Sequence, residues 1–165
     1  LMDLEEVCRF QPTLACIRIQ LRLDARRDDV MANAQQLRQV FLNLVLNAAD
    51  AVRDSYTEGE LAIQTSLQEV AAPGDRDPAH LVVRFMDNGH GISDESMTNI
   101  FDPFFTTKAA GKGTGLGLSV TFGIIKEHGG TIDVQSPAQL ANEKNGVDKS
   151  GAVFIIHLPV ASQMH

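Results

Sequence analysis

The sequence predicts a two-layer α/β (α+β) sandwich, in which helices cover one face of a mixed, mostly antiparallel sheet. Strand-like runs come in two hairpin-like pairs, over residues 61–86 and 131–158. A long amphipathic pattern over residues 33–53 and a shorter one over 115–128 predict the covering helices. Because strands and helices alternate irregularly, this arrangement is favoured over a doubly wound parallel sheet.

The first third of the chain contains the strongest helical signal. Residues 1–12 have apolar spacing typical of a helix, and Pro12 ends it, so we expect the end of an upstream helix or a linker there. Residues 13–165 are expected to form one domain, beginning with a strand over 14–23. The helix predicted over 33–53 has an apolar face of period 3.6, made by Leu37, Val40, Phe41, Leu44, Val45 and Ala48.

The rest of the chain alternates strands, loops and two further helices. Strands are predicted at 61–70, after a turn at Glu58 and Gly59, and then at 81–86, 131–136 and 152–158. A helix capped by Ser93 should run to about residue 101, and a helix over 115–128 should be stopped by Gly129. Polar or mobile connections are predicted at 71–80, 101–113 and 137–150.

Composition limits the function classes. The chain has 165 residues and a formal net charge of −7, which disfavours nucleic-acid binding and contact with anionic membranes. Cys8 and Cys16 form no metal-spaced set and predict a reducing, cytoplasmic setting. Neither a targeting signal nor an apolar run of membrane-spanning length is apparent, although a longer parent protein could carry an anchor.

The stretch over residues 87–118 has the features of a nucleotide site. Asp87 ends an apolar run, two glycines follow it, and Lys108 precedes three alternating glycines that open a helix. Glycines let backbone approach a ligand closely, and amides at a helix start favour anions. We therefore expect one end of the site to hold a base and the other to hold phosphates. The candidates are Asp87, Gly89, Gly91, Ile92, Phe105, Lys108, Gly113, Thr114, Gly115, Leu116 and Gly117.

Three polar residues in the long helix point to the same site. Asn43, Asn47 and Asp50 are mediocre residues for a helix interior, because their side chains compete for backbone hydrogen bonds. Spacings of four and three residues place them on one stripe beside the apolar face. They are expected to line a cavity at the edge of the core.

These segments resemble the boxes of the catalytic ATP-binding domain of sensor histidine kinases. QLRQVFLNLVLNAADA resembles the N box, DNGHGI the first glycine box, FDPFFTTK the F box and GKGTGLGLS the second glycine box. EHGGTIDVQS and GAVFIIHLP resemble the closing strands, so the resemblance covers nearly the whole chain from about Leu14. It implies the Bergerat ATP-binding fold, which is shared with gyrase B, the ninety-kilodalton heat-shock chaperones and the MutL repair proteins.

The resemblance also implies roles for single residues. Asp87 would accept a hydrogen bond from the adenine amino group, and Asn47 would hold Mg²⁺ on the phosphates of ATP. Lys108 would contact the phosphates, and Asp50 would help to position waters on the base side. Asn43 stands where gyrase-like ATPases have a glutamate; since an amide cannot act as a general base, slow hydrolysis is expected.

Simpler roles remain open for most of these residues. Asp87 could be a strand-end aspartate that makes a turn, and Asn47 a helix asparagine bonded to nearby backbone. Asp50 and Lys112 could be solvated surface residues. Phe101, Phe104 and Phe105 either anchor their loop to the core, or couple the lid to ATP or dock the phosphoacceptor helix.

Two departures from the family pattern stand out. Ala152 and Val153 occupy a place where many relatives have a threonine near adenine. No histidine has the acidic and proline neighbours of a phosphoacceptor: His80, His90, His128, His157 and His165 all lack them. We expect that histidine on a separate dimerisation domain, of the same or a partner protein, with a response regulator downstream and a homodimer in the full-length protein. The alternatives are an anti-sigma-type serine kinase or binding module, and a gyrase-like ATPase clamp.

Overall fold

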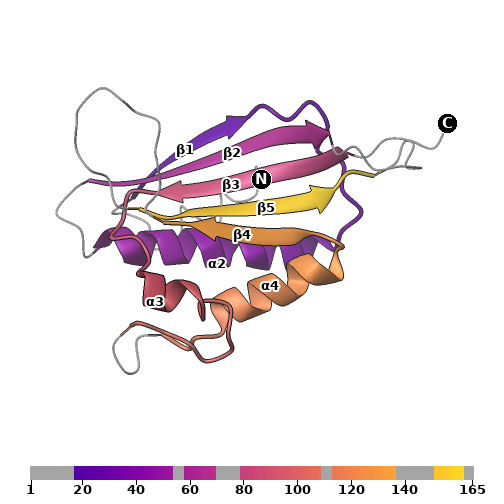
Figure 1. Ribbon diagram of the computed structural model, residues 1–165. Coiled ribbons are helices and arrows are strands. Elements are labelled where there is room, and N and C mark those ends of the chain that lie inside the picture. The colour runs from indigo at the N-terminus through magenta and orange to yellow at the C-terminus, as the bar shows by residue number, and fades with distance from the viewer. Residues whose placement is uncertain (1–16, 54–57, 70–78, 109–112, 137–150, 162–165) are drawn as a thin grey trace.

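The computed structural model describes residues 17–53, 58–69, 79–108, 113–136 and 151–161. Within them the chain folds as a layer of helices packed on one face of a sheet (Figure 1). The predicted two-layer sandwich is confirmed.

The sheet has five strands in the order β1–β2–β3–β5–β4. β1 is parallel to β2, whereas β2–β3, β3–β5 and β4–β5 are antiparallel. The β2–β3 and β4–β5 pairs confirm the two predicted hairpin-like pairs. The strands are β1 (Ile17–Leu23), β2 (Gly59–Glu69), β3 (Ala79–Asp87), β4 (Thr131–Gln135) and β5 (Val153–Pro159). β3 lies at the centre of the sheet. Its last residue, Asp87, therefore lies in the middle of the row of strand ends on one side of the sheet.

The helices are α2 (Ala34–Arg53), α3 (Asp94–Met97) and α4 (Gly117–Glu127). Figure 1 shows α2 and α4 side by side below the sheet, and α3 near the start of α4. The two long helices run antiparallel, since the backbone N–H of Asn33 bonds His128 at one end while Asn43 bonds Gly117 further along. The end of α2, the start of α4 and the end of β3 therefore gather on one side of the molecule.

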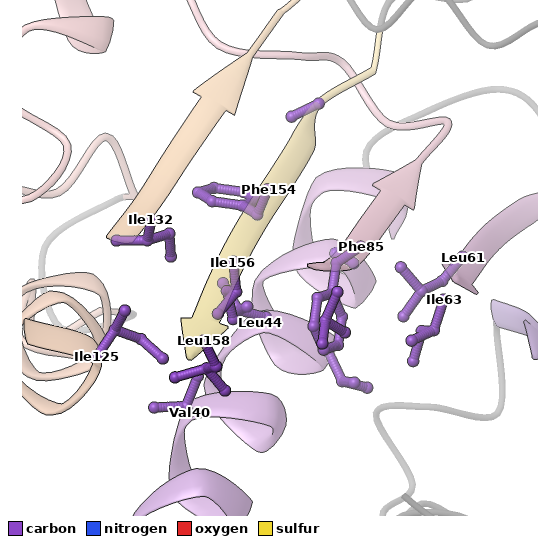
Figure 2. Packing of buried hydrophobic residues seen from close by; sticks show 14 of the residues in the cluster. Val40, Leu44, Leu61, Ile63, Phe85, Ile125, Ile132, Phe154, Ile156 and Leu158 are labelled. Carbon is purple, nitrogen blue, oxygen red and sulfur yellow. The ribbon is translucent and has the colours of Figure 1, made fainter. Parts of the chain in front are cut away.

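The core lies between α2 and the inner face of the sheet (Figure 2). Leu44 and Val40 of α2 pack with Phe85 of β3 and Ile156 of β5, all at most 1% exposed. The Phe41 ring adds an aromatic contact 5.6 Å from the centroid of Phe85. The predicted apolar face of the long helix is thus the buried face, which fixes where the polar stripe on the same helix must lie.

Local chemistry sets the helix ends. The Asn33 side chain accepts hydrogen bonds from the backbone N–H groups of Gln35 (2.9 Å) and Gln36 (3.3 Å), so Asn33 is the N-cap and α2 begins at Ala34. Gly129 has φ +70°, and the N–H of Gly130 donates to the carbonyl of Ile125 at 2.9 Å. This glycine-ended geometry stops α4 where the sequence predicted.

Several predicted boundaries are wrong. Gly59 is not a turn residue but the first residue of β2, because pairing with Ile17 extends the ladder, and β3 likewise begins at Ala79. The helix capped by Ser93 ends at Met97; beyond it, three-residue turns carry the chain to Phe105. Pro103 lacks the N–H that a continuing helix would need. The second long helix starts at Gly117 rather than 115.

Some expectations fall on residues outside the described ranges. They are the helix over 1–12, the first residues of the strand over 14–23, and the loops over 71–78 and 137–150. Cys8, Cys16 and Lys112 also lie there. Among the described residues, no helix combines the length and the apolarity that crossing a bilayer requires.

Candidate nucleotide site

Asp87 is a buried carboxylate at the end of the central strand. Its side chain accepts hydrogen bonds at Oδ1 from the backbone N–H of Gly89 (2.9 Å) and of Ala152 (3.3 Å). With the residue only 3% exposed, burial raises the pKa of Asp87 above 3.8, and these two N–H groups oppose the shift less strongly. Among the described residues no donor reaches Oδ2, so that oxygen is left to accept a bond from a ligand.

Gly89 lets the turn after Asp87 lie directly on α2. A Cβ on Gly89 would stand 2.7 Å from both the carbonyl carbon and the Cβ of Ala51, closer than real Cβ contacts come. The N–H of His90 donates to the Ala51 carbonyl at 3.3 Å, which fastens the turn there. His90 itself is exposed. The glycine is therefore required by a close approach to a helix, and this approach sets how far Asp87 lies from α2.

Gly91 and Ile92 fix the far side of the same turn. Gly91 has φ +74°, and a Cβ there would lie 2.7 Å from the hydroxyl of Ser136. That hydroxyl accepts from the N–H of Ile92 at 2.8 Å and donates to the carbonyl of Gly151 at 3.0 Å. We call residues 87–92 the Asp87 turn. Hydrogen bonds join it to Ala51 of α2, to Ser136 just after β4 and to Ala152 just before β5.

Two further residues that hold the Asp87 turn were not predicted from the sequence. Asn88 is 8% exposed; its side chain accepts from the N–H of Glu60 (2.7 Å) and donates to the carbonyl of Glu58 (2.8 Å). Asn88 stands in the DNGHGI segment but was not among the predicted site residues. Ser136 gave no signal either, because its partners Ile92 and Gly151 are distant in sequence. Both residues hold the Asp87 turn in place.

The stripe on α2 carries the three expected polar residues at the edge of the core. Asn43 and Asn47 are both half-buried. The Asn43 amide donates to the Gly117 carbonyl at 3.1 Å and to the hydroxyl of the buried Thr121 at 3.4 Å. Asn43 therefore joins α2 to the first turn of α4. Asn47 makes no side-chain hydrogen bond to any residue in the described ranges, which leaves its amide oxygen for a ligand such as a metal ion.

Asp50 lies one turn further and makes ionic contacts. Its Oδ1 pairs with Nη2 of Arg53 at 2.7 Å, and its Oδ2 pairs with Nζ of Lys108. Both sides of the second pair remain partly solvated, with side chains 28% and 36% exposed for Asp50 and Lys108. The structure thus places the predicted phosphate-binding lysine against the predicted base-side aspartate.

Two glycines pack closely against the segment that carries Lys108. The N–H of Phe104 donates to the Gly115 carbonyl at 2.9 Å, and a Cβ on Gly115 would lie 2.4 Å from the Phe104 carbonyl carbon. Phe104 has φ +68° and is 75% exposed. A Cβ on Gly113 would lie 2.9 Å from the Thr106 hydroxyl. We call residues 104–108 with 113–117 the Lys108 segment.

The aromatic residues of this region divide into two groups. Phe101 and Phe105 are partly buried against the core, and Phe101 stacks on Phe122 of α4 at 5.4 Å between centroids. These two residues anchor their loop to the core, which is one of the two roles predicted for the phenylalanines. Phe104 instead points to solvent, as do Thr114 and the 37% exposed Leu116. Ile92 packs on the core beside the Asp87 turn.

The predicted residues therefore gather on one side of the molecule, where β3 and α2 end and α4 begins (Figure 1). At one end of this site lies a buried acceptor. At the other lie an ammonium and the first amides of α4, where dipoles and unpaired N–H groups favour anions. Such a combination suits a ligand with an amino-bearing base and a charged tail.

Comparisons with known proteins bear on the family of this chain. A family model described as "Histidine kinase-, DNA gyrase B-, and HSP90-like ATPase" matches residues 32–162. The two-component sensor PprA of Pseudomonas aeruginosa is 36% identical over 146 residues, which are 88% of this chain and 14% of PprA. The sensory histidine kinase/phosphatase NtrB of Azospirillum brasilense is 43% identical over 125 residues, which are 73% of this chain and 30% of NtrB. The chain thus spans less than a third of these relatives.

Solved structures give the same picture for the domain alone. The catalytic domain of histidine kinase ThkA matches with a TM-score of 0.64 and 32% identity, covering 96% of this chain and 87% of that one. The mycobacterial sensor histidine kinase MprB matches with a TM-score of 0.69 at 24% identity, over 96% of this chain and 91% of that one, and supports the fold alone.

Proposed function

The chain belongs to the histidine kinase-, DNA gyrase B- and HSP90-like ATPase family as the catalytic domain of a histidine kinase, and we propose that it passes the γ-phosphoryl group of ATP to a histidine. That histidine would lie on a dimerisation domain, in a full-length homodimer. An aspartate of a response regulator would then receive the phosphoryl group. The family accounts for nucleotide use; the acceptor, the regulator, Mg²⁺ and a cytoplasmic location are parts of the proposal.

The observation that carries the proposal is the environment of Asp87. Its Oδ1 is occupied by two backbone N–H groups, so Oδ2 is the atom that would meet the base. An ionised carboxylate accepts hydrogen bonds and donates none, so it selects the amino group of adenine over the carbonyl of guanine. A charge-assisted bond of this kind contributes about 1.5–3 kcal/mol.

The phosphate end is assigned to the Lys108 segment. Lys108 would supply positive charge, and the amides from Gly113 to Gly117, with Thr114 and Leu116 between them, would surround the phosphates at the start of α4. Asn47 would hold Mg²⁺ through its amide oxygen. The metal ion would neutralise charge on the phosphates, and the residues of this chain would do the positioning on which phosphoryl transfer depends.

Asn43 explains why the phosphoryl group would not go to water. An amide has no basic site to take a proton from water, and both contacts of the Asn43 amide nitrogen bind it to α4. Its role is to hold the two helices that flank the phosphates in register. The isolated domain should therefore bind ATP and turn it over slowly.

A calorimetric titration tests the base assignment. In Asp87→Asn the side-chain oxygen can still accept from Gly89 and Ala152, but an NH₂ group replaces Oδ2 and would face the adenine amino group, donor against donor. We expect roughly ten- to hundredfold weaker binding of ATP and of adenosine. Glu69→Gln, which removes an exposed charge at the far end of β2, is the matched control. Equal affinities for wild type and Asp87→Asn would remove the assignment.

A labelling experiment tests the transfer. The domain is incubated with γ-labelled ATP and the dimerisation domain of a related kinase, and the acid stability of the product is measured. Acid-labile phosphohistidine supports the proposal. Acid-stable phosphoserine would support an anti-sigma-type kinase, and rapid release of phosphate without labelled protein would support a gyrase-like clamp.

A further inference from the structure

Lys108, which the proposed function assigns to the phosphates, is already bound to a carboxylate. Its Nζ pairs with Oδ2 of Asp50, although Asp50 lies on α2, 58 residues earlier in the chain. The lysine stem runs close to Gly113, where a Cβ would stand 3.1 Å from Cδ of Lys108. The side chain therefore spans from its own segment to the helix that carries Asn47.

We propose that Asp50 is a positioning residue that competes with the nucleotide phosphates for Lys108. In the free protein the carboxylate holds the ammonium against α2. Binding of a phosphate-bearing ligand exchanges one anionic partner of Lys108 for another, whereas binding of adenosine leaves the pair intact. The inference rests on the proposed function, since it needs a phosphate ligand beside Lys108.

The second partner of Asp50 makes this exchange feasible. Oδ1 stays paired with Arg53 at 2.7 Å, so Asp50 is not left as an unpaired charge when Lys108 leaves. Exposure of 36% for the Lys108 side chain and 28% for that of Asp50 keeps the pair screened by water. Exposed pairs of this kind contribute little to stability, so a phosphate can compete with the carboxylate.

The position of Asp50 along α2 places the Asp50–Lys108 pair beside Asn47. Asp50 follows Asn47 by three residues, on the same stripe of the helix. A ligand held by the Asn47 amide would therefore approach the Asp50–Lys108 pair along this stripe. If Asp50 instead helped to bind the metal ion, its removal would weaken binding of ATP with Mg²⁺, which is the opposite sign.

A double-mutant cycle tests the competition. Asp50→Asn should bind ATP about two- to fivefold more tightly than wild type and bind adenosine equally well. In a Lys108→Met background the gain should disappear, because the ammonium is gone; a gain that persisted there would come from general repulsion or from the freed Arg53. Glu69→Gln is the matched charge control and should change neither affinity.

The outcomes separate the two levels of the account. Unchanged or weaker ATP binding by Asp50→Asn, with normal adenosine binding, would overturn the competition and leave the proposed function standing. So would a gain of the same size with and without Lys108. Failure of wild type to bind either ligand would overturn the proposed function itself.

Discussion

The Asp87 turn and the Lys108 segment form the two ends of one site, and they are built in different ways. The Asp87 turn begins with the buried residues Asp87, Asn88 and Gly89 and is held by hydrogen bonds from the backbone: Asp87 accepts from two N–H groups, and Gly89 packs on Ala51. The Lys108 segment is largely exposed, and it contacts α2 through an ion pair between Lys108 and Asp50 and a hydrogen bond between Gly117 and Asn43. The first end is therefore fixed by packing, whereas Lys108 at the second end is held by a charge pair that water and salt can reach.

This difference predicts that the two ends respond differently to a ligand. Buried hydrogen bonds in close-packed surroundings change little when a ligand arrives, so the end proposed to recognise the base should be preformed. Partly solvated charges can change partners, so the end proposed to meet the phosphates should respond to the charge of the ligand. Three perturbations separate the two ends, in decreasing order of expected effect, and a glycine substitution elsewhere serves as a control.

Gly89→Ala should break the preformed end. The new Cβ would lie 2.7 Å from backbone and side-chain atoms of Ala51, so either the turn or α2 must shift. Overpacking of this kind costs about 1–3 kcal/mol of unfolding free energy, and adenosine binding should fall with it because Asp87 moves. Denaturant unfolding and an adenosine titration measure both. A fully stable variant that binds adenosine normally would show that the turn is not fixed by this contact.

Acidification should weaken base recognition earlier than an ordinary carboxylate would allow. Burial raises the pKa of Asp87 above 3.8, and the bond to adenine needs the ionised form. Adenosine affinity should therefore fall as the pH drops towards this raised pKa, by up to about tenfold per pH unit below it. Titrations of adenosine from neutral pH downwards measure this fall.

The same pKa shift also affects the free energy of unfolding. Here the effect of pH is reversed: stability falls as the pH rises, whereas adenosine affinity falls as the pH drops. The folded protein holds the Asp87 proton more tightly than the unfolded chain, so this group's contribution is full below 3.8 and is lost as pH rises through the raised pKa. Asp87→Asn should lack this loss. If the difference in unfolding free energy between wild type and Asp87→Asn stayed constant from pH 3.8 up through the raised pKa, the burial argument for Asp87 would be wrong.

Salt should affect only the end built from charges. Raising ionic strength from about 0.05 to 0.5 M screens Lys108 and the phosphates, so ATP affinity should fall several-fold while adenosine affinity changes little. Paired titrations at each salt concentration are the measurement. Equal salt dependence for the two ligands would place the electrostatic contribution outside the phosphate end.

Gly123→Ala should give the smallest effect and has the opposite sign. Gly123 lies in the middle of α4 and has nothing within 4 Å of its Cβ position. Alanine should stabilise the helix by about 0.4–1 kcal/mol by restricting the unfolded chain. Unfolding experiments beside Gly89→Ala make this the matched glycine control. Destabilisation here would show that Gly123 has a contact or flexibility role.

The layers of the fold could be predicted because they depend on periodic patterns. The apolar face of α2 and the two hairpin pairs follow directly from side-chain spacing. Boundaries were less accurate where pairing partners decide them: Gly59 joins β2 because Ile17 lies opposite it. The helix capped by Ser93 was predicted, but the short length of α3 could not be predicted from its cap alone, since the chain leaves helical geometry before Pro103.

The site was partly predictable for the same reason. Asp87 and the glycines stand in short motifs, and their proximity follows from the order of the strands. The contacts of Asn88 with Glu60 and of Ser136 with Gly151 join distant segments, so no local pattern signals them. Nor could the sequence show that Lys108 pairs with Asp50. Long-range polar contacts are decided by the fold, not by neighbours in the chain.

The most direct test of the account is a crystal structure with Mg²⁺ and a non-hydrolysable ATP analogue. We expect the adenine amino group within hydrogen-bonding distance of the Asp87 carboxylate, and the backbone of residues 87–92 unchanged from the free protein. A nucleotide bound with its base elsewhere, or a turn that must rebuild to admit adenine, would contradict a preformed base site.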